Sequence, residues 1–561
     1  MTEKTDPPAT VPWHALSLDE TYERLSTGSR GLSSEEAARR QRQYGKNTLP
    51  TARPPGLAEI ILHQFKSPLI YILLVAGVIS VLLGDFKDAG FIMAAIGSAV
   101  GIGNIWRFSA VVGQNGGGAY LIPYLIAVFL CALPLMVLEL AIGRHFHGTV
   151  VSAFRSVRPQ FQVLGWLLCG IVFLMLSYYL VITGWTLGYA LTSLGGEPLP
   201  FSRFTAGWLP VLLFVVAAGI SGIVVSLGIR EGIERISTVL IPVSVGILVV
   251  LLLYATTMPG FIQGVSFLLT PDFSVLGDPL LWSAAFGQAF FSLSVGTGIL
   301  LTYGAYVRPG ESIPGAALII TLADVGVALL AGLVIFPFVF SFGLVPTIGA
   351  ELAFTTLPGA FALMPNGWIV AAAFFLVLFF AALTSAISML EVGVAAVQES
   401  LDWSRRQAAS LLTGAIVIVG LPSALSYSAI DLRIGGIRVL DFMDETVGAL
   451  GLPVAATLLA VVFTWFIPPR MLTEEIGHSI ARFVHPLCRF VIPGVLMVTT
   501  GARLLAGLDD PGLRNLPGSA FIGTVLQVEG LVAIVLIVLV ITLILCRFRG
   551  CPLAGWIRGR T

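Results

Sequence analysis

Apolar runs of roughly 20 residues recur along most of the chain and are separated by short polar connections. A run of this length can cross the hydrocarbon core of a bilayer as a helix, since that core is about 30 Å thick. The pattern therefore predicts an all-α membrane protein. Twelve such runs follow position 89, at residues 90–110, 118–143, 164–192, 209–227, 237–257, 282–306, 313–343, 367–399, 407–428, 437–467, 486–506 and 520–546.

The composition fits a protein whose solvent is the bilayer. Hydrophobic residues make up 56% and charged residues 11% of the 561 residues, whereas an ordinary soluble domain is about one quarter charged. Basic and acidic residues balance at 31 each, so nothing suggests a nucleic-acid partner. The five cysteines form no CxxC pair, and neither a disulfide framework nor a zinc site is indicated.

Arginines are unequally shared between alternate connections, with fifteen in one set and the C-terminal tail and five in the opposite set. Because basic connections stay in the cytoplasm, the C-terminus and the start of the span at Gly90 are expected inside. The earlier apolar stretch from Ser67 to Gly84 conflicts with this, because nine basic residues up to Lys66 also favour the cytoplasm. The hypothesis is that this stretch does not span the membrane, unless the N-terminal segment lies outside.

The first 60 residues are polar and lack the pattern of a cleavable signal peptide. Ser17 with Glu20, and Ser33 with Glu36, form the capping-box pattern that opens a helix. These two helices are predicted to end near position 28 and at Gly45. Residues 13–50 are therefore predicted to form a small soluble helical module, which a proline-rich linker follows.

Three glycines, an asparagine and an arginine interrupt the first run, in the sequence GSAVGIGNIWR at 97–107. Unwound backbone is tolerated at membrane depth only where it lines a protein cavity. The pair of Gly97 and Gly101 alone would favour a helix-packing face. Asn104 and Arg107 favour a functional site instead, because polar and charged side chains at this depth are costly.

A second interruption, SLSVGTG at 292–298, lies in the sixth run, five runs after the first. Paired broken helices in corresponding positions of two halves are typical of transporters with inverted repeats and a site at the membrane midplane. Helix N-termini that point inward favour an anionic group such as a carboxylate, and freed carbonyl groups favour Na+.

From about residue 90 to 549 the chain resembles the neurotransmitter:sodium symporter family, which includes bacterial amino-acid transporters. The resemblance implies two inverted five-helix repeats with broken helices 1 and 6, plus two C-terminal helices. One departure is Ser109-Ala110, where the family usually has Pro-Tyr, and little effect is expected from it. Six ordered blocks carry the resemblance: GSAVGIGNIWRF (97–108), QNGGGAY (114–120), PLMVLELAIGR (134–144), YYLVITGWTLGYA (178–190), GQAFFSLSVGTG (287–298) and FFAALTSAISMLE (379–391).

The resemblance implies two Na+ sites made of oxygen ligands, which suit a hard cation. The first site is implied to use the carbonyls of Gly97, Val100 and Ala381 and the hydroxyls of Thr384 and Ser385. The second is implied to use the Ala99 carbonyl and the side chains of Asn104, Ser292 and Asp324, completed by the substrate carboxylate. One or two ions would then move in each cycle.

Asp324 stands where many family members have asparagine, and Ser292 where many have threonine. An unpaired carboxylate in the apolar run 317–342 would be costly, so a hydrogen-bonded structural role is the alternative to a functional one. The hypothesis is that Asp324 supplies the negative charge that other family members obtain from chloride. Transport would then require no chloride.

The substrate contacts implied by the resemblance surround both breaks. A carboxylate would meet the N–H groups of Ile102 and Gly103 and the Tyr179 hydroxyl, and an amine would meet the carbonyls of Ala99 and Phe291, with Ser294 as a further acceptor. The side-chain pocket would involve Met175, Phe291, Thr297, Ala386 and Met389. This lining predicts a medium or bulky hydrophobic amino acid, although aromatic residues and methionines in such helices are more often packing residues.

Arg107 and Asp441 are implied to form an outer gate that closes over the substrate as a charge-assisted pair. Glu139 and Glu391 are interpreted as buried structural hydrogen-bonding groups. The inner gate departs from the family, which usually begins its first span with an arginine and a tryptophan. Those positions fall here within the sequence VLLGDFKD at 81–88, so inward closure is expected to be weak or differently built.

Residues 13–50 and 64–85 resemble the N-terminus and first membrane helix of P-type cation-transporting ATPases, so the chain looks like a fusion. The ATPase motifs DKTG and TGE are absent, and the connections after residue 90 are too short for a nucleotide-binding domain. The predicted domains are a soluble module (1–63), an apolar helix and junction (64–89), a symporter domain (90–549) and a cytoplasmic tail (550–561).

The sequence thus predicts Na+-coupled symport, by alternating access, of an amino acid or a related small amine-carboxylate, and not an enzyme. A transport-impaired amino-acid sensor is one alternative, suggested by the altered inner gate. An accessory or regulatory fragment of a cation pump is the other, suggested by residues 13–85. Short outer connections without N-x-S/T acceptors favour the plasma membrane of a bacterium, and the oligomeric state is left open.

Overall fold

The computed structural model describes residues 16–44, 89–196, 199–344, 352–434 and 436–509. The predicted apolar runs 67–84 and 520–546 lie outside these ranges. By its internal contacts the chain divides into two compact units, Met1–Tyr71 and Ile72–Thr561.

The described part of the N-terminal unit contains two helices, α1 (Leu18–Arg24) and α2 (Ser34–Tyr44). The predicted capping box at Ser17 is present, because its hydroxyl accepts from the Glu20 N–H while its own N–H donates to the Glu20 carboxylate. The Arg40 guanidinium on α2 donates to the Leu25 and Ser26 carbonyls, at 2.7 and 3.0 Å, and so ties the end of α1 to α2.

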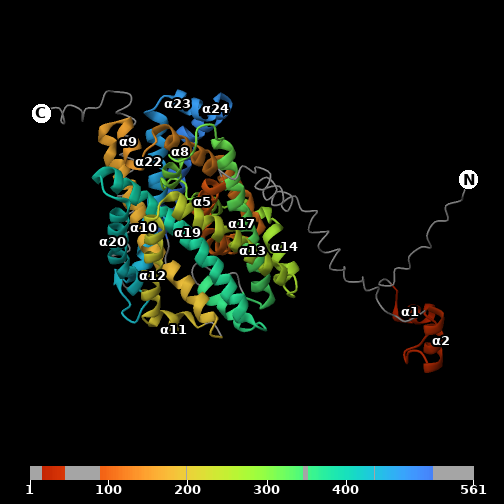
Figure 1. Cartoon of the computed structure of the whole chain (residues 1–561). Helices are drawn as coiled ribbons and strands as arrows, with labels where there is room; N and C mark the ends of the chain where they lie inside the picture. The colour runs from red at the N-terminus through yellow and green to blue at the C-terminus, as the bar shows by residue number, and fades with distance from the viewer. Residues whose placement is uncertain (1–15, 45–88, 197–198, 345–351, 435, 510–561) are drawn as a thin grey trace, which may run out of the picture. The chain divides into compact units, whose positions relative to one another are not determined.

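The second unit is a bundle of helices, drawn from orange to blue in Figure 1. Within the described residues, nine helical segments are long and apolar enough to cross a membrane. These spans contain η3 (Gly118–Tyr120), α7 (Leu121–Ala127), η4 (Val128–Ala132), α8 (Leu133–Phe146), η5 (Pro159–Phe161), α10 (Gln162–Ser193), α12 (Leu209–Ser226), η6 (Ile229–Glu234), α13 (Arg235–Ala255), α17 (Ile313–Ser341), α19 (Gly367–Leu401), α20 (Arg405–Leu425), α21 (Val439–Met443), η9 (Asp444–Gly448), α22 (Gly451–Trp465), α24 (His478–Pro486), η10 (Leu487–Val491) and α25 (Ile492–Asp509).

Shorter elements connect these spans, and the sequence pattern did not indicate them. The short helices are α9 (Val150–Val157), α11 (Phe201–Ala206), α14 (Phe261–Leu269), η7 (Phe273–Gly277), η8 (Leu352–Thr356), α18 (Leu357–Ala362) and α23 (Pro469–Ile476). A two-stranded antiparallel hairpin, β1 (Arg433–Ile434) and β2 (Ile437–Arg438), lies between α20 and α21.

Two spans are broken where the sequence predicts it. The first consists of α5 (Ala89–Ala99), the π-helical turn η2 (Gly103–Arg107) and α6 (Phe108–Gln114), with a bend of 51° at the break. The second consists of α15 (Pro279–Ser292) and α16 (Ile299–Gly304). Between α15 and α16 the backbone has positive φ at Ser294 (52°), Gly296 (85°) and Gly298 (75°), so no helix can continue through this segment.

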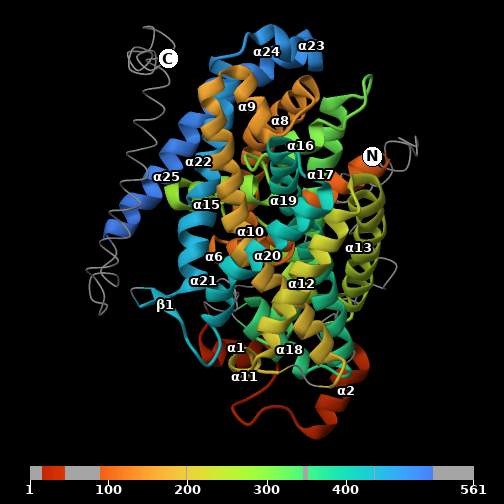
Figure 2. The same cartoon turned by 60° about the vertical axis from the view of Figure 1, so that its left-hand side comes forward.

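The spans repeat in order, since five spans that begin with a broken helix are followed by five more that begin with another. This is the fold of two inverted five-helix repeats with additional C-terminal helices. The long helices α10 and α19 pack against each other through the bundle (Figure 2), and α12 lies against α10 and α20. Every predicted span within the described residues is helical, and the sixth is made of the two short helices α15 and α16.

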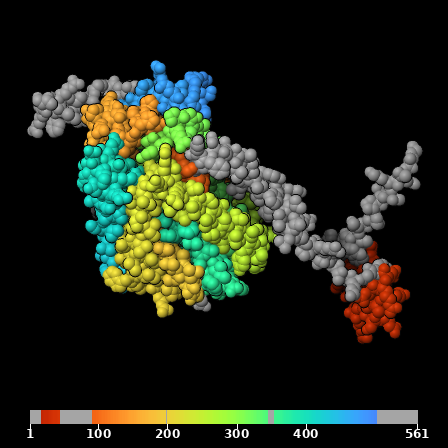
Figure 3. Space-filling view, in the orientation of Figure 1, coloured from red at the N-terminus to blue at the C-terminus, as the bar shows by residue number. Residues whose placement is uncertain are grey.

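The outer face of the bundle is apolar, as expected for contact with lipid. Figure 3 shows the face over α12 and α13 in yellow and yellow-green. Large apolar side chains are exposed along it, among them Leu212, Ile223, Val239, Val250 and Leu253. Polar side chains gather instead around the two breaks in the interior.

Candidate functional site

Three polar side chains from different spans meet beside the first break, among apolar neighbours. Asn104 in η2, Ser292 at the end of α15 and Asp324 in α17 are each no more than 1% exposed. The Asn104 amide donates to Ser292 Oγ at 2.9 Å and to Asp324 Oδ1 at 2.5 Å. The Ser292 hydroxyl donates to the same carboxylate at 2.9 to 3.1 Å. The structure thus brings together the three side chains implied for the second Na+ site.

The break in the first span orients Asn104. Its Oδ1 accepts from the Gly101 N–H at 2.9 Å, so the side chain caps backbone that the break leaves unpaired. Gln288, on α15, donates to the Gly103 carbonyl at 2.9 Å and joins the two broken spans. The sequence prediction did not include Gln288, and its position one turn before Ser292 is the only sequence signal that could have indicated it.

The first implied Na+ site lies between α5 and α19. The Ser385 hydroxyl is 3.4 Å from the Gly97 carbonyl, and Thr384 Oγ1 is 3.1 Å from the Ala381 carbonyl. A Cβ built on Gly97 would lie 3.3 Å from the Thr384 Cβ, which shows how closely the helices approach. Val100, the fifth implied ligand, is buried one turn after Gly97.

A pocket of about 30 Å³ lies between the two breaks and is called the central pocket below. The Ile102 N–H points at the Tyr179 hydroxyl at 3.4 Å, so the two groups implied to hold a carboxylate face each other. Of the implied substrate contacts, the pocket is lined by Ala99, Gly103, Met175, Tyr179, Phe291, Ser294, Thr297 and Met389. Ala386 is buried on α19 but is not part of this lining.

The central pocket is also lined by Gly101 of the first break and by two residues that sequence reasoning missed altogether, Ile299 on α16 and Leu452 on α22. Neither carries a signal in the sequence, because both are ordinary apolar residues of membrane helices. Only the packing of α16 and α22 on the broken spans identifies them.

The unwound segment after α15 is held by hydrogen bonds to neighbouring helices. The Ser294 hydroxyl donates to the Ser98 carbonyl at 3.0 Å, and Thr297 Oγ1 donates to the Ser294 carbonyl at 2.6 Å. The Glu139 carboxylate on α8 accepts from the Gly296 N–H. Glu139 therefore makes a hydrogen bond that fits its predicted structural role.

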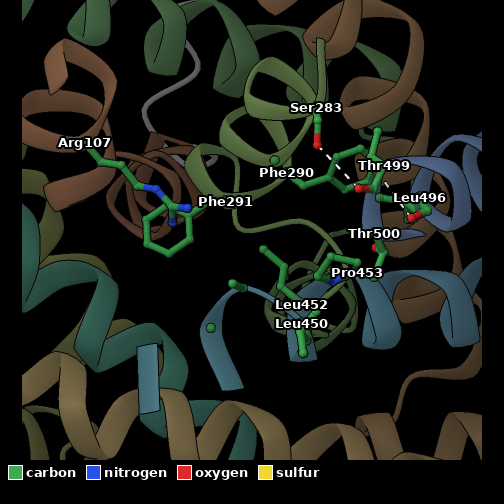
Figure 4. Close-up of a pocket in the computed structure, with 13 residues that line it drawn as sticks. Arg107, Ser283, Phe290, Phe291, Leu450, Leu452, Pro453, Leu496, Thr499 and Thr500 are labelled. Atoms are coloured by element: carbon green, nitrogen blue, oxygen red, sulfur yellow. Dashed lines mark hydrogen bonds between the residues drawn. The ribbon is translucent and has the colours of Figure 1, made fainter. Parts of the chain in front are cut away.

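A cavity of about 460 Å³ lies on the side of α6 and α21 and is called the outer cavity, because it is lined by the residues implied for the outer gate. Arg107 and Asp441 both line it, but each has another partner in this structure. The Arg107 guanidinium lies 4.2 Å from the centre of the Phe291 ring (Figure 4). The Asp441 carboxylate accepts from the Tyr427 hydroxyl at 2.8 Å. Asp444 lines the same cavity.

The hairpin of β1 and β2 is linked to this cavity through Tyr427. The Arg438 guanidinium lies 4.3 Å from the centre of the Tyr427 ring and pairs with Asp431 at 3.2 Å. Hydrogen bonding to Arg433, and then to Arg438, holds the pKa of the Asp431 carboxyl below its usual range.

A second cavity, of about 370 Å³, lies at the opposite end between α5, η6, α20 and the connection from α16 to α17. Arg405 lines it and pairs with Glu391 on α19, while its Nε donates to the Val225 carbonyl at 2.7 Å. Glu391 thus has the hydrogen-bonded partner expected of a buried structural acid. Nearby, Arg144 pairs with Glu475 at 2.6 Å and ties α8 to α23.

The candidate cation ligands are hydroxyl, amide and carbonyl oxygens with a single carboxylate. Within the described ranges, no group of three or more histidine, cysteine, aspartate or glutamate side chains is placed to hold a metal ion. Oxygen donors of this kind suit a hard monovalent cation such as Na+.

The broken spans, the oxygen-lined breaks and the buried pocket between two cavities define a secondary transporter of the broken-helix class. The model of the sodium:neurotransmitter symporter family matches residues 86–217 and 207–548. The chain belongs to this family, and it is therefore a sodium-dependent membrane transporter. A second model, the N-terminus of cation transporters and ATPases, matches residues 13–80.

Known relatives agree over the length of the symporter domain. The chain is 35% identical over 433 residues to the uncharacterized sodium-dependent transporter YhdH of Bacillus subtilis, a match that covers 73% of this chain and 95% of YhdH. It is 28% identical over 418 residues to the creatine transporter of Torpedo marmorata, covering 64% of this chain and 67% of that protein. The crystal structure of MhsT in complex with L-phenylalanine is 37% identical, with a TM-score of 0.68, and covers 73% of this chain and 97% of that chain.

Proposed function

We propose that this symporter carries an amino acid with a hydrophobic side chain, driven by two Na+ ions. One observation carries the proposal. The Ile102 N–H and the Tyr179 hydroxyl face each other, and they lie beside the buried polar group of Asn104, Ser292 and Asp324. A carboxylate bound there would complete the ligand set of one ion. Substrate and ion would then each raise the affinity for the other.

The amine of the substrate is assigned to the carbonyls of Ala99 and Phe291. Both residues line the central pocket, and carbonyls at the C-terminal end of a helix favour a cation. The side chain would lie against Met175, Thr297 and Met389. The match to MhsT covers 97% of that protein, whose crystal structure is a complex with L-phenylalanine. This supports an apolar substrate.

Asp324 makes chloride unnecessary in this proposal. Its carboxylate is fully buried and already accepts from Asn104 and Ser292. A fixed negative charge at this position balances the positive charge of the bound ions, which is the purpose that a chloride ion would otherwise serve.

The outer gate is proposed to close when the Arg107 guanidinium pairs with an aspartate that lines the outer cavity. Asp441 is the residue predicted from the sequence, and the structure offers Asp444 as a second acceptor. A methyl group added at Gly448 would touch both the Tyr178 hydroxyl and the Asp444 carboxylate. Asp444 therefore lies close to Tyr178 on α10, whereas Asp441 is bound by Tyr427.

The membrane orientation proposed here has the C-terminus and the start of α5 in the cytoplasm of a bacterial cell. The excess of arginines on one side supports it. The N-terminal unit is proposed to be a regulatory or targeting appendage, since residues 13–80 match only the N-terminus of a cation pump.

Uptake into proteoliposomes tests the proposal. The intact chain should accumulate radiolabelled L-leucine or L-phenylalanine only with an inward Na+ gradient, and Asp324→Ala should abolish accumulation. Asp272→Asn, at an exposed loop position far from the breaks in sequence, is the matched control and should transport normally. Na+-dependent binding without accumulation by the intact chain would favour an amino-acid sensor instead.

A further inference from the structure

A second hollow, of about 40 Å³, lies directly beside the central pocket. It lies between α15, α22 and α25 (Figure 4) and shares Arg107, Ser283, Gly287 and Ala449 with the outer cavity. Its apolar lining residues include Phe290, Leu450 and Leu496. Its far end carries the hydroxyl-bearing residues Ser283, Thr499 and Thr500, and Ser283 Oγ is 3.4 Å from the Thr499 carbonyl.

Two side chains, Phe291 and Leu452, line both the hollow and the central pocket and therefore form the partition between them. The Phe291 ring is held by the Arg107 guanidinium, 4.2 Å from its centre. Leu452 has no such restraint from a charged group and fills its part of the partition by packing alone. It is 4% exposed.

The backbone of α22 fixes where Leu452 lies. A Cβ built on Gly296, in the unwound segment, would overlap the Cβ of Ala456 on α22. Leu452 precedes Ala456 by four residues and so lies on the same face of α22, one turn away. The position of Leu452 relative to the substrate is thus set by a close contact between α22 and the second break.

We propose that Leu452 sets the upper size limit of the substrate side chain, and that the hollow behind it is a subsite for the distal part of a larger side chain. This inference rests on the proposed function, since it takes an amino acid as the substrate. The apolar walls and the distal hydroxyl groups make the subsite suitable for an aromatic ring that ends in a polar group, as in an indole or a phenol.

Binding to the purified full chain tests this inference. Dissociation constants for L-leucine, L-phenylalanine and L-tryptophan are measured with Na+ for the wild type and Leu452→Ala. The variant should bind tryptophan better relative to leucine by about tenfold, the range expected when a few methylene groups of space are added to an apolar pocket. Leu452→Phe should change the ratio in the opposite direction.

Leu459→Ala is the matched control, because Leu459 is a buried leucine of the same helix that lines neither the hollow nor the central pocket. It should leave the ratio at the wild-type value. An unchanged ratio in both Leu452→Ala and Leu452→Phe, with leucine still bound, would overturn the inference. Should the wild type bind none of the three amino acids with Na+, it is the proposed function that fails.

Discussion

At the scale of single residues, the site depends on a carboxylate in an apolar helix, where a charged side chain is costly. Asp324 is fully buried, yet its oxygens accept hydrogen bonds from Asn104 and Ser292. Buried polar groups are tolerated when such partners are present. A purely structural acid would need only these bonds, whereas an ion site also needs the negative charge, and a substitution can separate the two requirements.

Asp324→Asn keeps the shape and one acceptor oxygen but removes the charge. We expect the Na+ concentration for half-maximal uptake to rise at least about tenfold, because a charged hydrogen-bonding partner contributes roughly 1.5–3 kcal/mol. Wild-type uptake should be unchanged when chloride is replaced by gluconate, and uptake by the variant should become chloride-dependent. Loss of wild-type uptake in gluconate would refute the assignment of Asp324 as the compensating charge.

At the scale of elements, the second break depends on glycine at one position. Gly296 has a φ of 85°, and a Cβ there would overlap Ala456. Gly310 has a similar φ of 94°, but nothing lies within 4 Å of a Cβ built on it. Replacing either glycine by alanine should therefore impose a similar backbone strain. Only the added methyl group at position 296 would also meet a neighbouring helix, α22.

Gly296→Ala should abolish Na+-driven uptake, because the added methyl group pushes α22 away from the unwound segment. Gly310→Ala should retain most of the uptake, at a cost in stability of only about 1–2 kcal/mol for the left-handed backbone. Surface expression measured in parallel separates lost transport from lost protein. Equal loss in both variants would mean that backbone strain, and not the contact with Ala456, decides the effect.

A buried ion pair joins three spans at the other end of the bundle. Glu391 on α19 is fully buried and pairs with Arg405, which also reaches the end of α12. Glu391→Gln should lower the free energy of unfolding by up to about 3 kcal/mol, since it leaves a guanidinium that is only 20% exposed without its counter-charge.

Glu474→Gln is the control for this change. Glu474 pairs with Arg470 at 2.8 Å, but the two side chains are 53% and 86% exposed. Removing an exposed pair should cost no more than about 1 kcal/mol. Thermal unfolding of both variants in detergent checks the difference, and equal midpoints would show that the pair at Glu391 does not stabilise the bundle.

At the scale of the whole molecule, the symporter site lies entirely in the second compact unit. Every proposed ion and substrate contact falls between residues 97 and 452, whereas the described part of the first unit ends at residue 44. A chain that lacks residues 1–44 should therefore insert and carry out Na+-driven uptake at a rate within about twofold of the wild type. Proteoliposome uptake normalised to inserted protein measures this, and loss of coupling in the truncated chain would mean that the module acts on the transport cycle itself.

The sequence by itself determined the membrane class, the order of the spans and both breaks. Run length and the cost of polar residues in lipid act locally along the chain, so they can be read without contacts. The same cost singled out Asn104, Arg107 and Asp324, because each is conspicuous within an apolar run. The first N-terminal helix could be predicted for a similar reason, since its capping box is completed within four residues. At the second helix, Ser33 accepts from the Glu36 N–H as predicted, but the Glu36 carboxylate pairs with Arg39 and Arg40.

Only the tertiary structure decided which groups face one another. Asn104 meets Asp324 across 220 residues of chain, and Asp441 is engaged by Tyr427, which no spacing indicates. Leu452 and Ile299 became pocket residues through the packing of α22 and α16, although as apolar residues they look like any other in these helices. Local propensity and the bilayer fix where a helix lies along the sequence, whereas the face that it turns to the substrate depends on close packing among many spans.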